Sequence, residues 1–366
     1  MEHPENDDLY KGLKVNKGVA DVPTVNPYLK KRIQRKEYTP AEFVEGILKG
    51  NITILSQAVT LVESSKYEHQ QVAQEIIEKC LPHAGKSVRI GITGVPGAGK
   101  STSIDAFGMH LIGEGRKLAV LAIDPSSERS KGSILGDKTR MEALSREKNA
   151  FIRPSPSAGS LGGVARKTRE TIVLCEAAGF DTVFVETVGV GHSATAVHSM
   201  VDFFLLIQLA GTGDELQGIK RGIMEMADGI IINKADGDNL EKAKLAAAQF
   251  RNALHLFPAP ESGWFPKVLT YSGYYNLGIK EIWDMVGEYM EFTQKNGYFN
   301  YKRNEQAKYW MYESINDTLR ETFYHNPAVE SMLNLTEQQV LNNEISSFVA
   351  AKRMMDLFLE NLSASK

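Results

Sequence analysis

The chain has 366 residues, of which 42% are hydrophobic and 24% are charged, so it can bury a core of the size found in globular enzymes. Its 42 Lys and Arg residues nearly balance its 45 Asp and Glu residues, which argues against nucleic acid or an acidic membrane surface as the main partner. The amino terminus is polar and acidic and no apolar run approaches membrane-spanning length, so we expect a cytoplasmic protein without a membrane partner.

The first predicted elements are helical and follow a polar start. Residues 1–38 mix Pro, Asn, Lys and Asp, and we expect them to wrap the surface or to stay mobile. The pattern changes at Thr39, because Thr39, Pro40 and Glu42 form a helix start signal and apolar residues then recur at helical spacing. We therefore assign residues 39–86 to an N-terminal helical subdomain.

The middle of the chain, residues 87–296, alternates short apolar runs with amphipathic helical patterns. Six runs are rich in Val, Ile, Leu and Phe without polar alternation, as expected of strands buried on both faces. They are residues 88–93, 117–124, 181–186, 202–210, 229–234 and 267–272. This pattern predicts an α/β domain with a mostly parallel sheet and helices on both sides.

A phosphate-binding loop lies between the first of these runs and a helical pattern. The segment fits G-x-x-x-x-G-K-[ST], in which backbone N–H groups cradle phosphate oxygens, the Lys neutralises phosphate charge and the hydroxyl binds Mg²⁺. The predicted nucleotide-binding residues of the loop are Gly94, Val95, Pro96, Gly97, Ala98, Gly99, Lys100, Ser101 and Thr102. The loop and its context predict a P-loop NTPase, but the loop alone does not distinguish ATP from GTP.

Two later strands end in acidic residues at the same predicted edge of the sheet. Asp124 and Glu186 can each bind Mg²⁺ directly or through water, and the N–H of Gly189 can sense a terminal phosphate. Asp137 and Arg140 lie in a Gly-rich segment that could order around the metal and this phosphate. The alternative for either strand-end acid is a solvated terminus without a role.

A guanine-reading pattern, N-K-x-D, follows the strand at residues 229–234 with Asn233, Lys234 and Asp236. The Asp236 carboxylate can accept hydrogen bonds from the ring N–H and the exocyclic amine of guanine, whereas adenine would leave this acceptor unpaired. Asn233 is expected to contact the other edge of the base, and Lys234 is expected to lie along its plane. The pattern therefore predicts GTP and GDP as ligands.

The last predicted strand leads into Ser272, Gly273 and Tyr274. GTPases often use a backbone N–H at this place to contact the guanine oxygen, so these residues are further candidates for nucleotide binding. A simple strand-to-helix turn is the alternative.

Residues 297–366 read as helix throughout, with aromatic residues and Met at helical spacing. Such stripes are more often ordinary core, and a helical arm that packs on a second subunit is the alternative.

Three segments, residues 124–141, 185–197 and 209–223, together resemble the methylmalonyl-CoA-mutase-associated GTPases. The resemblance runs from about Thr39 to the helical tail. It implies a homodimer joined by the C-terminal helices and slow intrinsic GTP hydrolysis. It also implies a chaperone that gates cofactor delivery to, and protects, an adenosylcobalamin-dependent acyl-CoA mutase, with methylmalonyl-CoA mutase as the expected partner.

The resemblance also implies roles for individual residues. Asp124 and Asp137 would belong to a first switch and Glu186 to a second, with Mg²⁺ as their shared ligand. Asp214 and Lys220 would belong to a third switch that responds to the nucleotide and to the mutase.

The sequence departs from the family pattern after the second switch. The family usually has Gln, Ser and Glu where this chain has His192, Ser193 and Ala194. Either His192 replaces the Gln in orienting water or it has no catalytic part. The candidate catalytic residues are Lys100, Glu186, His192, Asp214 and Lys220; no general base stands out, which suits phosphoryl transfer.

Other functions remain open at this stage. A P-loop kinase that phosphorylates a metabolite or protein is the main alternative, although no acceptor pocket is marked in the sequence. A nickel-insertion GTPase would be favoured by a His-rich tract, but the eight histidines are scattered. No D-x-H-x-x-G motif is present, so we expect that this chain does not coordinate cobalamin through that motif.

Overall fold

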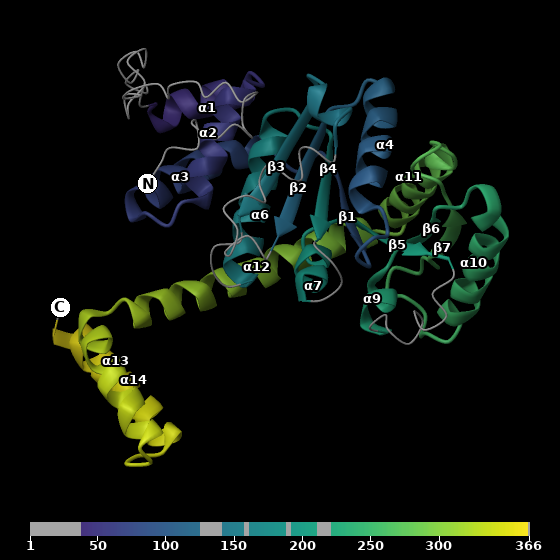
Figure 1. Cartoon of the computed structure of the whole chain (residues 1–366). Helices are drawn as coiled ribbons and strands as arrows, with labels where there is room; N and C mark the ends of the chain where they lie inside the picture. The colour runs from purple at the N-terminus through teal and green to yellow at the C-terminus, as the bar shows by residue number, and fades with distance from the viewer. Residues whose placement is uncertain (1–37, 125–140, 157–160, 188–191, 211–220, 365–366) are drawn as a thin grey trace, which may run out of the picture. The chain divides into compact units, whose positions relative to one another are not determined.

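The computed structural model describes residues 38–124, 141–156, 161–187, 192–210 and 221–364 (Figure 1). The described residues from Pro40 onward belong to one compact unit. They form a central parallel sheet with helices on both faces, three helices before the sheet and three after it.

The sheet has seven strands in the order β3-β2-β4-β1-β5-β6-β7, and every neighbouring pair is parallel. This confirms the predicted α/β fold. The strands are β1 (Val88–Gly94), β2 (Leu118–Asp124), β3 (Ala150–Pro156), β4 (Thr182–Thr187), β5 (Phe203–Leu209), β6 (Gly229–Asn233) and β7 (Lys267–Thr270). Since parallel strands end at one edge, their carboxyl ends bring the predicted motifs together.

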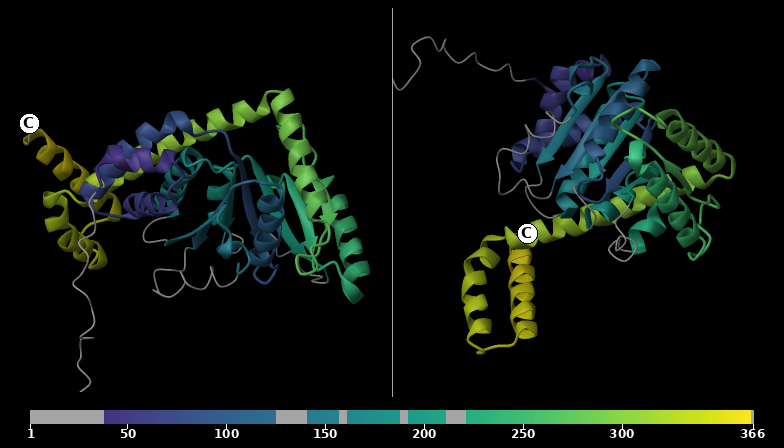
Figure 2. Two further views of the ribbon diagram at one scale, coloured as in Figure 1. Left: turned by 90° about the horizontal axis from the view of Figure 1, so that it is seen from above. Right: turned by 45° about the vertical axis from the view of Figure 1, so that its right-hand side comes forward.

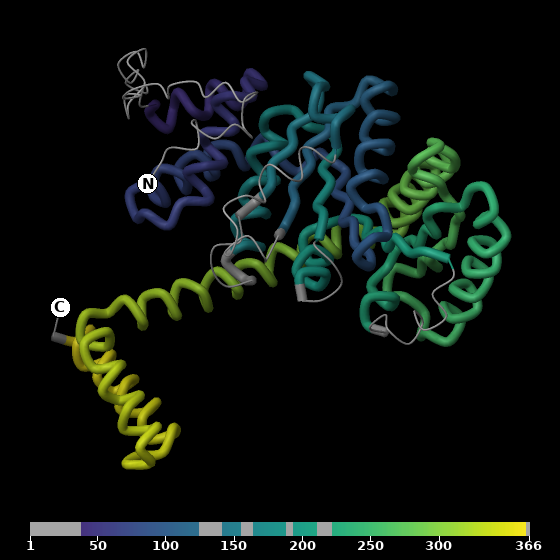
Figure 3. Tube along the Cα trace, in the orientation of Figure 1, coloured from purple at the N-terminus to yellow at the C-terminus, as the bar shows by residue number. Residues whose placement is uncertain are grey.

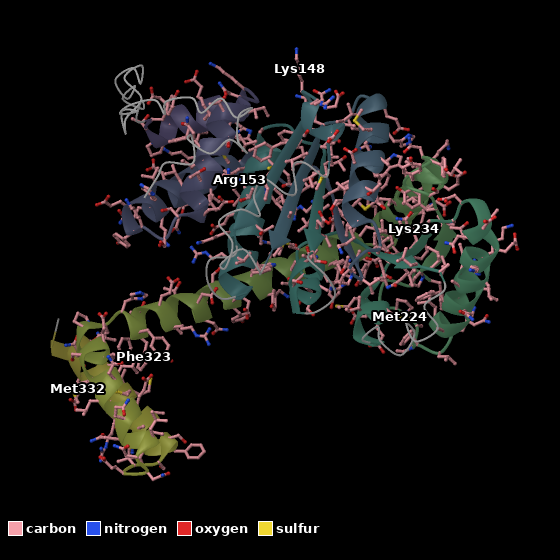
Figure 4. All side chains as sticks on the ribbon, in the orientation of Figure 1. Lys148, Arg153, Met224, Lys234, Phe323 and Met332 are labelled. Atoms are coloured by element: carbon pink, nitrogen blue, oxygen red, sulfur yellow. The ribbon has the colours of Figure 1, made fainter. Side chains whose placement is uncertain are left out.

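Strand β3 is not among the strands predicted from the sequence. Its sequence contains Arg153, Pro154 and Pro156, which the apolar-run criterion rejects. Proline is tolerated because β3 lies at the edge of the sheet, where one side of the strand needs no ladder hydrogen bonds. Arg153, labelled in Figure 4, forms an ion pair with Glu63 of the N-terminal helices, so its charge is satisfied.

Helices cover both faces of the sheet. They are α4 (Lys100–Gly113), α6 (Leu161–Ala177), α7 (His192–His198), α9 (Arg221–Met226), α10 (Leu240–Leu254) and α11 (Ile279–Lys295). Residues of α4 and α11 share the main apolar core with alternate residues of β1 and β5, such as Ile90, Ile92 and Phe203. The side chains between them on these strands face α7, because a Cβ added at Gly91 would meet Val197. The two faces are therefore distinct layers.

Three N-terminal helices, α1 (Pro40–Leu48), α2 (Ile52–Glu63) and α3 (Tyr67–Cys80), precede the sheet. Asn51 caps α2 by accepting hydrogen bonds from two backbone N–H groups of its first turn. The Lys167 ammonium of α6 donates to the backbone oxygen of Glu63, which places a cation at the C-terminal end of α2. These contacts join the N-terminal helices to the sheet domain.

The chain ends in α12 (Tyr298–Tyr324), α13 (Pro327–Leu341) and α14 (Ser347–Ala364). Figures 2 and 3 show α13 and α14 side by side beyond the end of α12. The first turns of α12 are fixed to the sheet domain, because Arg303 forms a two-pronged ion pair with Asp202. None of the described helices is long and apolar enough to cross a membrane. The predicted domain limits at residues 86 and 296 stay predictions.

Candidate nucleotide site

The phosphate loop connects β1 to α4 and depends on its glycines. Gly97 and Gly99 have φ angles of 81° and 85°, in the left-handed region that side chains disfavour. A Cβ at Gly99 would lie 2.6 Å from the Asn233 amide nitrogen, and a Cβ at Gly94 would lie 2.4 Å from the Ile207 backbone oxygen. The loop therefore fits closely against β5 and the end of β6 because positions 94 and 99 are glycine.

Lys100 is the first residue of α4, and its ammonium group donates to the backbone oxygen of Gly94 at 3.0 Å. The side chain thus folds back over the loop. This places a positive charge at the N-terminus of a helix, where the helix dipole also favours anions. The loop offers the cation and the backbone N–H groups that a polyphosphate needs.

Ser101 and Glu186 lie together beside this loop. The hydroxyl of Ser101 is 3.4 Å from a carboxylate oxygen of Glu186, which is buried at the end of β4. The register pairs Glu186 with Ile92 of β1 and Ala122 of β2. The backbone of Asp124 therefore lies two residues further along β2, at the same sheet edge.

The Ser101 hydroxyl and the Glu186 carboxylate fit a Mg²⁺ ion that is bound together with a nucleotide. They do not form a metal site made of protein side chains alone. Among the described residues, no three or more His, Cys, Asp or Glu side chains are grouped to hold a metal ion. Mg²⁺ in nucleotide sites usually takes one or two protein oxygens and completes its octahedron with water and phosphate. The Ser101 hydroxyl and the Glu186 carboxylate supply such oxygens.

Asn233 connects the phosphate loop to the loop after β7. Its amide nitrogen donates to the Ala98 backbone oxygen at 2.7 Å. Its amide oxygen accepts from the N–H groups of Lys234 at 2.7 Å and Gly273 at 3.2 Å. Because the side chain is buried and makes these contacts, Asn233 positions the loops. Its amide nitrogen carries a second N–H, so the expected contact with the base stays a prediction.

The N–H of Gly273 donates to the Asn233 amide oxygen, and its expected contact with a base oxygen stays a prediction. The hydroxyl of Ser272 donates to the Asp236 carboxylate at 2.5 Å, a contact that sequence reasoning missed because it had considered only backbone groups here. A short antiparallel bridge between Ser272 and Leu277 closes this loop, with Tyr274 exposed on it. The loop therefore holds the Asp236 carboxylate in one orientation.

Lys234 follows β6 with a φ angle of 59°, unusual for a residue with a side chain, and Figure 4 marks it at this end of the sheet. Its side chain is exposed beside the partly buried Asp236. Below the loop, burial raises the pKa of Tyr271 to about 12, so its phenol stays neutral under the Gly273 backbone. The candidate base site thus combines the Asp236 carboxylate, the neighbouring Lys234 cation and the neutral phenol of Tyr271 below the loop.

The remaining predicted residues lie at the limits of the described chain. Four lie outside the described residues, as does Arg140: Asp137, Gly189, Asp214 and Lys220. The structure gives only backbone positions for Asp124, the last residue of β2, and His192, the first residue of α7. His192 therefore begins a helix, and both expectations for its role stay open.

Comparison with known proteins supports this arrangement of motifs. A family model described as "Methylmalonyl Co-A mutase-associated GTPase MeaB" matches residues 55–328. The chain is 43% identical over 320 residues to "GTPase ArgK" of Escherichia coli, covering 87% of this chain and 97% of that protein. It is 44% identical over 323 residues to "Methylmalonic aciduria type A homolog, mitochondrial" of Mus musculus, covering 86% of this chain and 78% of that protein.

A solved structure titled "Crystal structure of LAO/AO transport system kinase" superposes with a TM-score of 0.69 at 37% identity, covering 88% of this chain and 99% of that one. The predicted fold, the predicted family resemblance and the GTPase assignment are confirmed by these matches. The chain therefore belongs to the methylmalonyl-CoA-mutase-associated GTPases, the family described as MeaB.

Proposed function

We propose that this chain is a GTP-driven chaperone of an adenosylcobalamin-dependent acyl-CoA mutase, with methylmalonyl-CoA mutase as the expected partner. The chaperone gates delivery of the cobalamin cofactor to the mutase and protects the enzyme. The proposal rests on family membership together with one structural observation, the junction at Asn233 that joins the phosphate loop to the base-reading loops. This junction joins segments that are far apart in the sequence and that together form the proposed guanine nucleotide site.

Guanine specificity is proposed to come from Asp236. Held by the Ser272 hydroxyl, its carboxylate accepts hydrogen bonds from the ring N–H and the exocyclic amine of guanine. Adenine would leave this acceptor unpaired, and an unpaired buried acceptor costs about 1–3 kcal/mol. Lys234 lies along the base with its aliphatic stem.

Phosphate binding is proposed for the backbone N–H groups of the loop and for Lys100, which exchanges its contact with the Gly94 oxygen for phosphate oxygens. Ser101 and Glu186 would hold Mg²⁺. Asp124 and Asp137 would be further ligands from the first switch. When bound, Mg²⁺ neutralises charge on the terminal phosphates. Positioning and charge neutralisation would drive GTP hydrolysis, and hydrolysis would be slow because no general base takes part.

The switch residues are proposals from family resemblance. Gly189 senses the terminal phosphate, and Asp214 and Lys220 change partners when this phosphate leaves. His192 begins α7, directly after the second switch, where it can orient water in place of the Gln that is usual in the family. Cobalamin is proposed to be held by the mutase and not by a D-x-H-x-x-G motif in this chain.

A homodimer joined by the C-terminal helices is part of the proposal. The ends of α12, α13 and α14 surround an apolar groove of about 760 Å³. Phe323, labelled in Figure 4, lines this groove, and the nearby Leu341 and Phe348 are 71% and 86% exposed. Exposed apolar side chains that gather around one groove are typical of an interface. A second copy of the arm would cover them.

The proposal is tested with purified protein and a purified mutase in its cobalamin-free form. We expect the protein to bind the mutase and nucleotide to set the rate of cofactor loading, so GDP and a non-hydrolysable GTP analogue should differ. A control with the Asp236→Asn variant should lose the effect of GTP but regain it with XTP. If no loading or binding difference appears in any nucleotide state, the chaperone role is wrong. If labelled γ-phosphate passes to a substrate and not to water, the kinase alternative replaces it.

A further inference from the structure

Gln208, the penultimate residue of β5, is a buried polar side chain that the nucleotide site described above does not use. It is 0% exposed, and neither atom of its side-chain amide has a hydrogen-bond partner among the residues the structure describes. Its strand is otherwise apolar. A buried amide without partners is costly, so its presence calls for an explanation.

The strand register fixes the direction of this side chain. Gln208 pairs with Ile232 of β6, and its neighbour Ile207 pairs with Ile231. Ile207 and Ile231 both belong to the main apolar core. Gln208 therefore points to the opposite face of the sheet. This face is covered by α7 and α9, the helices that follow the second and third proposed switches.

Two threonines lie on the same face at the same edge. The Thr187 hydroxyl at the end of β4 donates to the Thr93 hydroxyl on β1 at 2.9 Å, and both side chains are fully buried. Thr93 pairs with Leu206, so Gln208 lies one diagonal step away on the neighbouring strand. Long side chains reach such diagonal neighbours, which are about 7–8 Å apart.

The threonine pair is coupled to the metal side of the site through the backbone. Thr187 directly follows Glu186, whose carboxylate faces Ser101 on the other face of the sheet. A change in the position of Glu186 therefore moves the Thr187 hydroxyl as well. A hydroxyl can donate one hydrogen bond and accept two, and an amide can do both, so the groups are compatible.

We propose that Gln208 is a positioning residue that joins the Thr187–Thr93 hydroxyl pair when the terminal phosphate of GTP is bound. In the nucleotide-free and GDP-bound forms its amide stays without the partner that GTP provides, in keeping with the absence of a partner among the described residues. With GTP, a polar chain crosses β4, β1 and β5 and links Glu186 to the end of β5, directly before the proposed third switch. The inference rests on the proposed use of GTP at this site.

The test compares Gln208→Met with wild type, because Met has a similar shape without hydrogen-bonding groups. We expect the Kd of a non-hydrolysable GTP analogue to rise about 5–30-fold and the Kd of GDP to stay within about twofold. We expect the Tm of the nucleotide-free variant to rise by about 2–4 °C, because two unpaired polar atoms are removed from the interior. The control variant Leu206→Met, on the same face of the same strand, should leave the Kd of the GTP analogue and the Kd of GDP unchanged.

A double-mutant cycle adds Thr93→Val. If the two residues act together, the double variant should bind the GTP analogue no more weakly than the weaker single variant, while GDP shows no coupling. Equal changes for GDP and the GTP analogue, or a lower Tm of nucleotide-free Gln208→Met, would overturn the inference, because the amide then has a structural partner such as ordered water. Failure of wild type to bind GTP would instead refute the proposed function.

Discussion

Replacing Gly99 by Ala should damage the nucleotide site through a contact that can be isolated with a matched control. Gly99 has a φ angle of 85°, and a Cβ there would lie 2.6 Å from the Asn233 amide nitrogen. Gly115 has a φ angle of 84°, but a Cβ there would meet nothing within 4 Å. The two substitutions impose the same backbone strain and differ in the clash with Asn233.

The expected magnitudes follow from these two contributions. A left-handed backbone with a side chain costs about 1–2 kcal/mol at either position. At Gly99 the added methyl also displaces the amide that donates to the Ala98 oxygen at 2.7 Å, and losing a buried hydrogen bond costs about 1–3 kcal/mol more. Gly99→Ala should therefore be about 2–5 kcal/mol less stable than wild type, against about 1–2 kcal/mol for Gly115→Ala.

Urea unfolding of the nucleotide-free variants measures this difference, and calorimetric titration with GDP measures its effect on the site. We expect GDP affinity to fall at least about tenfold in Gly99→Ala, which corresponds to about 1.4 kcal/mol, and to stay unchanged in Gly115→Ala. If the two variants lose equal stability and keep equal GDP affinity, the junction at Asn233 does not hold the loop, and the reasoning fails.

Three further results are expected. Asp236→Asn should weaken GTP binding and favour xanthine nucleotides, and an unchanged GTP affinity in a competition assay would contradict the assignment. Lys100→Ala should abolish tight nucleotide binding in calorimetric titration; retained micromolar affinity would contradict the phosphate-loop assignment. Burial alone would raise the pKa of Glu176, but hydrogen bonds from Arg89, Ser87 and a backbone N–H hold it below its usual value. Because a lowered folded-state pKa gives stability above the unfolded value, stability should fall as the carboxylate protonates below about pH 4.5, and Glu176→Gln should lose about 3–5 kcal/mol in urea unfolding and remove this acid dependence.

The sheet was predictable because its strands are buried on both faces and read as continuous apolar runs. Strand β3 did not follow this rule, since its Arg153 is satisfied by Glu63, which lies 90 residues earlier in the chain. A local pattern contains no information about such a partner. The edge position that tolerates its prolines is likewise a property of the assembled sheet.

The candidate site was likewise predictable only in part. Motif spacing placed Lys100 and Asp236 at one sheet edge, because the carboxyl ends of parallel strands meet there. The role of Asn233 could not be predicted, because its partners Ala98 and Gly273 lie 135 and 40 residues away. Nor could the contact of Ser272 with Asp236, for which the sequence offered only a serine at a strand end.

Gln208 is the residue at which local pattern and tertiary structure disagree most. One polar residue in an apolar run could have been noticed in the sequence, but it could equally have faced water. Only its full burial, with both amide atoms unpaired among the described residues, separates it from an ordinary strand residue. Stability alone would favour Leu or Met here, and the proposed state in which the amide is paired gives a reason for the glutamine. We propose that the GTP-bound form is that state, because Gln208 lies one diagonal step from Thr93 on the neighbouring strand, directly before the end of β5.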